Sequence, residues 1–284
     1  MKSDSEKLVC KVCSSNYFFL YDYANHVRKF KPIFIKHYIL FYMLEILKIV
    51  GIKLPVLEAR ILFFPKFKIQ VCYDCGYGWY MKPLTKEQLK KYYESSYWHS
   101  HKNISFDQDA FKINKRAIQQ FDFVKSFVVN AKKILEIGSA EAFFTQYYKF
   151  KNPHVDSHIV ESGLNWQKYH QESNIRIVAD YFPCKLNKAY DYIHTSHWLE
   201  HVLDLEETLT CFHHCLSDSG LVFVEVPNCD RSYWKKDMGD IPHIHFFSLK
   251  SLIMLFESNQ FKALKTDIID SNQEGIRALF QKLS

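Results

Sequence analysis

The sequence predicts an α/β protein, in which a small cysteine-rich module precedes a doubly wound, mostly parallel sheet. Strand-like and helix-like segments alternate from residue 133 onward, which is typical of a parallel sheet with helices on both faces. Two CxxC pairs lie upstream of this region. Of the 284 residues, 48% are hydrophobic and 24% are charged, proportions that exclude a disordered, collagen-like or disulfide-scaffold chain. We expect the module in residues 1–100 and the α/β domain in residues 101–284.

The cysteines of the two pairs have the spacing of a metal site; they are Cys10, Cys13, Cys72 and Cys75. A CxxC turn directs two thiolates to one point, and two such turns form the tetrahedral sulfur cage that zinc prefers. Because four protein ligands close the coordination sphere, we expect a structural zinc with no catalytic role. A rubredoxin-like iron site and a ligand set that has lost its metal are the alternatives.

A basic segment, residues 26–71, separates the two pairs. It carries nine basic and two acidic residues, a net charge of +7, whereas the whole chain carries +6. Glu45 and Lys48 interrupt its most apolar run, residues 37–57, which argues against a transmembrane helix. We expect an amphipathic helix that packs on the protein itself, with a lipid-facing helix or a partner-protein surface as alternatives. The first residues lack the apolar stretch of a signal peptide, so we expect a cytoplasmic protein, peripheral to the inner membrane face if the helix is lipid-facing.

The α/β domain is expected to begin with a helix over residues 107–129, where apolar residues recur at helical spacing. Strands are then expected at 133–138, 157–161, 175–180, 190–196, 221–227 and 263–269. Helices are expected at 140–150, 165–171, 205–216 and 249–258. A last apolar segment, 276–280, is expected to pair antiparallel at an edge of the sheet.

Acidic residues end two of the predicted strands, where ligands of such sheets bind. Glu161 ends the second strand and is placed to accept hydrogen bonds from both hydroxyls of a ribose. Asp180 ends the third strand and is placed for an adenine amine. The tight turn that begins at Gly138 lets a ligand lie against backbone amides. Together these features predict an adenosine-containing cofactor.

Six pieces of the sequence, in order, resemble a known family. They are the two CxxC pairs, CGYGWYMKPLTKEQLKKYYESSYW, KILEIGSAEAFF, YDYIHTSHWLEHVLD, GLVFVEVPN and PHIHFFSLKSLIMLFESNQF. The chain resembles class I S-adenosylmethionine-dependent methyltransferases of the subgroup with an N-terminal zinc ribbon, over nearly all residues outside 26–71. The resemblance implies the Rossmann-like fold of that class, S-adenosylmethionine as cofactor and a methyl-transfer activity.

The resemblance also implies a cofactor role for seven residues. They are Glu136, Gly138, Ser139 and Ala140 at the turn after the first strand, Glu161 at the ribose, Asp180 at the adenine and His197 beside the methionine portion. In one respect the chain departs from the family, which usually has glycines where Ala140 and Ala142 stand. Alanine lacks the access of glycine to positive φ and adds a methyl group where the cofactor passes. Weakened cofactor binding, or a catalytically inactive copy, is therefore an alternative to an active enzyme.

For catalysis the protein must align a nucleophile behind the methyl group and remove its proton. His201, in the LEH turn after the fourth strand, is the first candidate for the base and His245 is the next, with a structural role as the alternative for each. The expected acceptor is a hydroxyl of a small molecule: a sugar, a glycan precursor or a lipid-linked saccharide. An RNA methyltransferase is the alternative, but apolar side chains interleave the basic residues of 26–71, so nucleic acid is the less favoured partner.

Overall fold

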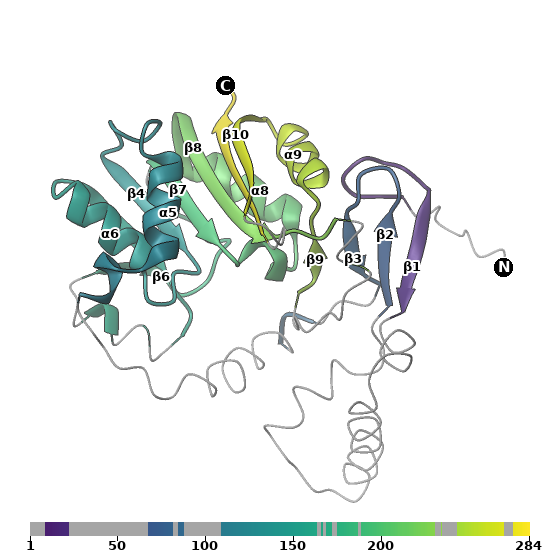
Figure 1. Cartoon of the computed structure of the whole chain (residues 1–284), viewed down its shortest axis with the longest axis horizontal. Helices are drawn as coiled ribbons and strands as arrows, with labels where there is room; N and C mark the ends of the chain where they lie inside the picture. The colour runs from purple at the N-terminus through teal and green to yellow at the C-terminus, as the bar shows by residue number, and fades with distance from the viewer. Residues whose placement is uncertain are drawn as a thin grey trace, which may run out of the picture. The chain divides into compact units, whose positions relative to one another are not determined.

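The structure is a computed structural model that describes residues 9–22, 68–81, 85–87, 109–163, 166, 169–171, 175–186, 189–230, 234, 243–269 and 275–284. The chain forms two compact units (Figure 1). Unit 1 consists of Met1–Lys102 and Cys229–Ser248, and unit 2 of Asn103–Asn228 and Leu249–Ser284. Of the basic segment 26–71, only residues 68–71 are described, so the predicted amphipathic helix lies outside the described residues.

Unit 1 contains an antiparallel sheet whose described strands have the order β1 (Phe18–Asp22), β2 (Lys68–Cys72), β3 (Gly78–Tyr80) and β9 (His245–Phe246). The strand β9 comes from the far end of the sequence and pairs with β3. The backbone N–H of Cys229 also donates to the carbonyl of Phe247 at 2.7 Å. Because of these contacts, residues 229–248 belong to unit 1. The boundary expected from the sequence, at residue 100, places them in the α/β domain.

Unit 2 contains the predicted α/β sheet. In its described part the strand order is β10 (Phe261–Ile269), β11 (Gly275–Lys282), β8 (Leu216–Pro227), β7 (Tyr190–Ser196), β4 (Lys133–Ile137), β5 (Asp156–Val160) and β6 (Arg176–Ala179). The strands from β8 to β6 are parallel, and β11 and β10 add to β8 in antiparallel pairs. The mostly parallel sheet is therefore confirmed. The last strand was expected at an edge, and this is wrong, because β11 lies between β8 and β10.

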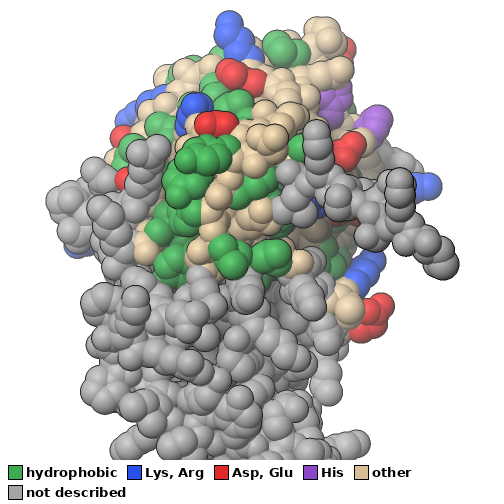
Figure 2. Space-filling view, turned by 90° about the vertical axis from the view of Figure 1, so that its right-hand side faces the viewer, with side chains coloured by type: hydrophobic (Ala, Val, Ile, Leu, Met, Phe, Trp, Pro, Cys, Tyr) green, Lys and Arg blue, Asp and Glu red, His purple; other side chains and the backbone are tan. Residues whose placement is uncertain are grey.

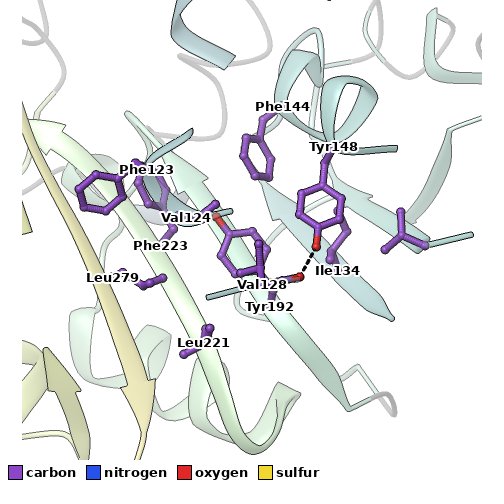
Figure 3. Packing of buried hydrophobic residues seen from close by; sticks show 11 residues of the cluster. Phe123, Val124, Val128, Ile134, Phe144, Tyr148, Tyr192, Leu221, Phe223 and Leu279 are labelled. Atoms are coloured by element: carbon purple, nitrogen blue, oxygen red, sulfur yellow. Dashed lines mark hydrogen bonds between the residues drawn. The ribbon is translucent and has the colours of Figure 1, made fainter. Parts of the chain in front are cut away.

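Helices cover both faces of this sheet. The helices α5 (Lys115–Val124) and α6 (Phe143–Lys151) pack on one face, where Phe123 and Tyr148 contact Phe223 and Tyr192 (Figure 3). The Tyr148 hydroxyl donates to the carbonyl of Val128 at 2.7 Å. On the other face lie α8 (Leu205–Cys215) and α9 (Leu249–Glu257). There the ring of Phe256 in α9 stacks on Phe280 of β11 at 4.0 Å.

Two predicted helices begin later than expected. The helix expected at 107–129 is instead a 3₁₀ turn, η3 (Ala110–Lys112), followed by α5. The break comes at Asn114, whose side chain accepts the N–H of Ala117 at 2.9 Å and caps α5. The helix expected from residue 140 begins at Phe143 because Ala140 and Ala142 have left-handed backbone conformations.

Hydrophobic side chains gather on the β1 side of unit 1, the side that faces the viewer in Figure 2. Tyr17, Leu20 and Tyr73 are exposed hydrophobic residues of this unit, and Tyr17 stacks on Tyr73 with ring centroids 4.5 Å apart. In the part of the chain that the structure describes, no helix is long and apolar enough to cross a bilayer.

Candidate active site

The candidate site lies where the strand order of unit 2 reverses. The strand β4 pairs with β5 on one side and with β7 on the other, both parallel, and ligands of doubly wound sheets bind at this point beyond the carboxyl ends of the strands. A cavity of about 490 Å³ lies there, within the usual size range of ligand pockets. It is lined by residues 114–117 and Gln120 at the α5 side, by Glu136 of β4, by residues 138–141 after β4, by Phe143 and Phe144 of α6, and by Ser196 at the end of β7.

The loop after β4, residues 138–142, has an unusual backbone. Gly138 has φ +68°, and a Cβ at this position would lie 2.5 Å from Cδ1 of Trp198. Both the conformation and the space therefore require glycine. Ala140 and Ala142 have φ values of +43° and +53°, so the two alanines adopt a left-handed conformation that glycine adopts more easily.

Hydrogen bonds hold Ala140 in this conformation. Its N–H donates to Oε2 of Glu161 at 2.7 Å, and its carbonyl lies 2.6 Å from Nε2 of His170. Burial lowers the pKa of His170 to about 4, so the ring is neutral and its Nε2–H donates to the carbonyl. Ala142 is fully buried against Ile159. Its methyl group therefore points into the core, contrary to the expectation that it lies in the path of the cofactor, whereas Ala140 does line the cavity.

Glu136 connects the end of β4 to the start of α6. Ala142 at the N-cap of α6 offers no side chain to the free N–H groups, and Oε2 of Glu136 accepts the N–H of Thr145 at 2.9 Å instead. Burial raises the pKa of Glu136 to about 7 despite this bond. Glu136 lines the cavity, so the charge of the cavity changes near neutral pH.

The predicted cofactor residues do not all line the cavity. Glu136, Gly138, Ser139 and Ala140 do. Glu161 lies behind Ala140 and also accepts the N–H of Gly163 at 2.8 Å. Asp180 is exposed just after β6. The Ser139 side chain is 7% exposed, and its Oγ has no hydrogen-bond partner within the described part of the chain.

His197 is held between two carboxylates. Its Nδ1 is 3.5 Å from Glu200 and its Nε2 is 3.5 Å from Glu225. Burial lowers the pKa of His197, but the bonds to Glu200 and Glu225 outweigh this effect and raise the pKa to about 9. His197 is therefore an imidazolium at neutral pH and has no lone pair with which to take a proton.

Glu225, in the middle of this arrangement, was not predicted from the sequence. It is 1% exposed, and its carboxylate accepts from Nε of Arg277 at 2.9 Å and from Nε2 of Gln120 at 3.1 Å. Burial raises the pKa of Glu225, but His197, Arg277 and Gln120 outweigh this and lower it to about 2. A charged residue within the apolar strand segment LVFVEVP was the available signal, but nothing local identifies Arg277, 52 residues away, as its partner.

The two candidate bases lie in different units. His201 ends the short 3₁₀ helix η4 (Leu199–His201) in unit 2, and its Nε2 is 3.8 Å from Glu200. His245 lies on β9 in unit 1, buried, with its Nδ1 2.6 Å from the hydroxyl of Tyr77. A catalytic role for either histidine stays a prediction.

The four cysteines of unit 1 converge in two matching turns. In each turn a backbone N–H donates to the carbonyl of the first cysteine: Ser14 to Cys10 at 2.8 Å, and Gly76 to Cys72 at 3.0 Å. Ser14 and Gly76 both have positive φ, +58° and +78°. The Sγ atoms are 3.6 Å apart for Cys10 and Cys75 and 3.5 Å apart for Cys13 and Cys72, and all four lie within 4.8 Å of one another. Tetrahedral zinc with Zn–S bonds of about 2.3 Å requires sulfur separations of about 3.8 Å, so the set fits this metal.

The comparisons with known proteins agree with this fold. The sequence matches a methyltransferase domain family over residues 73–266. No curated protein sequence matches the chain. Among solved structures, the chain is similar to the 1,6-didemethyltoxoflavin-N1-methyltransferase of Burkholderia thailandensis, whose structure contains 1,6-didemethyltoxoflavin and S-adenosylhomocysteine. The two chains are 13% identical, with a TM-score of 0.51, and the match covers 75% of this chain and 97% of that one. It is also similar to a SAM-dependent methyltransferase of Archaeoglobus fulgidus, with 16% identity, a TM-score of 0.50 and coverage of 66% and 100%.

Proposed function

The chain belongs to the methyltransferase domain family and is a methyltransferase, and on this premise we propose that it transfers the methyl group of S-adenosylmethionine to a hydroxyl of a small molecule. The acceptor would be a sugar, a glycan precursor or a lipid-linked saccharide. The observation that carries the proposal is the cavity at the carboxyl ends of β4 and β7, with the residues that line it.

The cavity offers groups that suit this cofactor. When bound, S-adenosylmethionine supplies an electrophilic methyl group on a sulfonium. The buried Oγ of Ser139, which lacks a partner within the described residues, is available to a polar ligand atom. Glu161 accepts the backbone N–H groups of Ala140 and Gly163, which fix its carboxylate beside the loop after β4, and we propose that it faces the ribose of the cofactor. The enzyme from Burkholderia, which has a similar fold and was solved with S-adenosylhomocysteine, supports the same cofactor.

For the proton of the acceptor hydroxyl, we propose His201 as the base. His197 is excluded from this role because it is already protonated at neutral pH. Glu200 lies between the two histidines, 3.5 Å from Nδ1 of His197 and 3.8 Å from Nε2 of His201. We expect His201→Ala to lower kcat while leaving the affinity for S-adenosylhomocysteine unchanged. An unchanged kcat would remove His201 from the mechanism.

We also propose that Cys10, Cys13, Cys72 and Cys75 bind a structural zinc. The proposal is supported by the Sγ atoms of the four residues, which all lie within 4.8 Å of one another. The role is structural because four sulfur ligands leave no open coordination position.

The first test is a calorimetric titration of the zinc-loaded protein with S-adenosylhomocysteine. We expect binding in wild type and a loss of about 10- to 100-fold or more in Glu161→Ala, since each charge-assisted bond is worth about 1.5–3 kcal/mol. Glu206→Ala, on the exposed surface of α8, is the matched control and should bind as wild type. Absence of binding to wild type would contradict the proposal and favour a non-catalytic binding protein.

A second candidate function, RNA methylation, is favoured by the net charge of +7 in residues 26–71. Phosphate contacts make affinity fall steeply as salt rises, whereas binding of a neutral sugar should hardly respond. Oligonucleotide binding that weakens about 1,000-fold between 50 and 200 mM salt would favour RNA over the saccharide.

A further inference from the structure

We propose that Cys211 and Cys215 form a reversible oxidation site, in which a hydroperoxide oxidises Cys211 and Cys215 then closes a disulfide with it. Both residues lie in α8, whereas the residues that line the candidate cavity come from other elements. The site is therefore independent of methyl transfer. It depends on the separation of the two sulfur atoms, on the exposure of each thiol and on the hydrogen bonds that Cys211 makes.

The sulfur atoms of Cys211 and Cys215 are in contact. The two residues are four positions apart in α8, so their side chains lie on one face of the helix, and their Sγ atoms are 3.8 Å apart. Helix geometry places the two Cα atoms about 6.2 Å apart, inside the range of about 4.4–6.8 Å found in disulfides. A bond between them needs only the last turn of α8 to tighten.

Such a disulfide would be strained, which suits a reversible modification. The Cβ atoms of residues four apart in a helix are about 5–6 Å apart, but those of a disulfide are about 3.5–4.5 Å apart. The end of α8 has to absorb this difference. Cys215 is the last residue of the helix, and Leu216 after it is already extended, with ψ 144°. Strained disulfides are more easily reduced than relaxed ones, so this bond is a poor structural cross-link and a good reversible one.

The exposure of the two thiols sets the order of reaction. Cys211 is partly exposed, whereas Cys215 is 2% exposed. A hydroperoxide in solution therefore reaches Cys211 first. Cys215 is protected from the solvent but lies beside the sulfur that has reacted.

The hydrogen bonds of Cys211 favour the reactive form of its thiol. When neutral, the thiol donates to the carbonyl of Cys184 at 3.2 Å. When it is ionised, hydrogen bonds from Cys215 and from the backbone of Cys184 outweigh the effect of burial and lower its pKa to about 7. The thiolate is the nucleophile of a cysteine, and a thiol with a pKa near the ambient pH attacks fastest.

Cys184 is a less suitable partner for Cys211. It follows β6 and approaches Cys211 through its carbonyl oxygen, whereas Cys215 makes its contact through sulfur. Burial raises the pKa of Cys184 to about 11, so its thiol stays protonated at neutral pH. The structure therefore favours Cys215 as the residue that closes the disulfide.

The reaction has two steps. The Cys211 thiolate attacks one oxygen of the hydroperoxide, the O–O bond breaks, and the products are a sulfenic acid on Cys211 and, after protonation, an alcohol, or water when the oxidant is hydrogen peroxide. Cys215 then attacks the Cys211 sulfur, the S–O bond breaks, and the oxygen leaves as water with the proton of the Cys215 thiol. The two thiols lose two electrons, which reduce the hydroperoxide.

The test uses the full-length, zinc-loaded protein treated with a few equivalents of hydrogen peroxide. Free thiols are blocked with iodoacetamide in denaturant, and the tryptic peptides are weighed by mass spectrometry. Cys211, Cys215 and Cys229 are in peptide 189–231, and Cys184 is in peptide 177–185. We expect peptide 189–231 to lose two hydrogen atoms and to carry one blocked thiol instead of three. Reduced glutathione should restore all three thiols, and zinc content is measured alongside to detect oxidation in unit 1.

Variants assign the two roles. In Cys215→Ser the sulfenic acid on Cys211 should persist, and dimedone should label it. Cys211→Ser should give neither the disulfide nor a dimedone adduct on Cys215. Cys229→Ser, a buried position in unit 1, is the matched control and should form the disulfide as wild type does. The melting temperature of each variant is measured, and Cys211→Ser, at the partly exposed position, provides the test if Cys215→Ser does not fold.

Four results would overturn the inference. The first is a wild-type peptide 189–231 that keeps three free thiols after peroxide. The second is a sulfenic acid in wild type that never becomes a disulfide, and the third is a disulfide that persists in Cys211→Ser. The fourth is a cross-link between peptides 177–185 and 189–231 in wild type, which would assign the second role to Cys184. Loss of S-adenosylhomocysteine binding bears only on the proposed function.

Discussion

Ala140 and Ala142 show how a strained backbone is retained at the candidate site. A left-handed conformation costs an L-residue other than glycine about 1–2 kcal/mol. At Ala140 the bonds to Glu161 and His170 offset this cost, and at Ala142 the methyl group gains burial against Ile159. Both alanines are therefore compatible with the loop geometry that a cofactor site of this class requires.

The two positions should respond differently to glycine. We expect Ala140→Gly to raise the free energy of unfolding by about 0.5–1 kcal/mol, because it relieves the strain at φ +43°. Ala142→Gly should gain less, since it also removes a fully buried methyl group. Denaturant unfolding measures both. Ala278→Gly, a buried strand position in β11, is the control and should destabilise the protein; equal destabilisation by Ala140→Gly would mean that the strain is absent.

His197 should make the free energy of unfolding depend on pH above about pH 6.5. Its pKa is raised from 6.5 to about 9 in the folded protein, so the stability that its charge contributes is fully present below pH 6.5 and is lost as the pH rises through 9. The pKa of Glu225 is lowered from 4.5 to about 2, so its contribution is present above pH 4.5 and is lost as the pH falls through 2. The contribution of the pair is therefore largest between about pH 4.5 and 6.5.

The corresponding measurement is the free energy of unfolding against pH for wild type and His197→Gln. We expect the difference between the two proteins to shrink from pH 6.5 to pH 9 and above. His154→Gln, at an exposed position, should stay within about 0.5 kcal/mol of wild type. A difference that does not change across this range would mean that Glu200 and Glu225 do not hold His197 in its charged form.

At the scale of structural elements, the stability of the two cysteine turns should depend on bound metal. We expect Cys13→Ser to lower bound zinc below one equivalent and to destabilise unit 1, because structural zinc contributes about 10–16 kcal/mol of binding energy to small domains. Metal content and thermal unfolding, with and without a chelator, measure the effect. Cys184→Ser, in unit 2 outside the cluster, should keep its zinc. Full zinc content in Cys13→Ser would contradict the ligand set.

The sequence was sufficient to predict the parallel strands but not every element. Strands that are buried on both faces appear as short apolar runs, and β4, β5, β7 and β8 coincide with such runs. The place of β11 between β8 and β10 depends on pairing between distant segments, which no local pattern encodes. The apolar spacing of residues 107–129 continues through Asn114, and only the capping hydrogen bond shows that the helix starts there.

In the candidate site, too, the features that depend on local sequence could be predicted and those that depend on distant contacts could not. The turn after β4 and the acidic residue after β5 follow from strand-end positions, and Glu136, Gly138, Ser139 and Ala140 do line the cavity. The Glu225–Arg277 contact and the bond from His170 to Ala140 join residues that come together only when the sheet and the loops have formed. Sequence spacing carries no signal for these contacts.

For the whole molecule, the main consequence is that unit 1 is built from two separate stretches of chain. Residues 1–102 alone lack β9, which pairs with β3 and supplies the His245 partner of Tyr77. We expect a fragment of residues 1–102 to bind zinc but to unfold without cooperativity. The same fragment joined by a flexible linker to residues 229–248 should unfold cooperatively. Near-UV circular dichroism during heating distinguishes the two.

The linked fragment also allows a control. His245→Ala removes the bond to Tyr77 but keeps β9, so we expect it to lower the melting temperature and to preserve cooperativity. Cooperative unfolding of residues 1–102 alone would show that unit 1 does not require its second stretch.

The position of β11 has a consequence for the synthesis of this protein. Glu225 and its partner Arg277 are 52 residues apart, so at about 5–20 residues per second the ribosome makes the second roughly 3–10 s after the first. During that interval β8 has an unpaired edge and Glu225 lacks the guanidinium that later neutralises it. An exposed strand edge is a template for pairing with other chains. We therefore expect the yield of folded protein to depend on how fast the residues between Glu225 and Arg277 are translated.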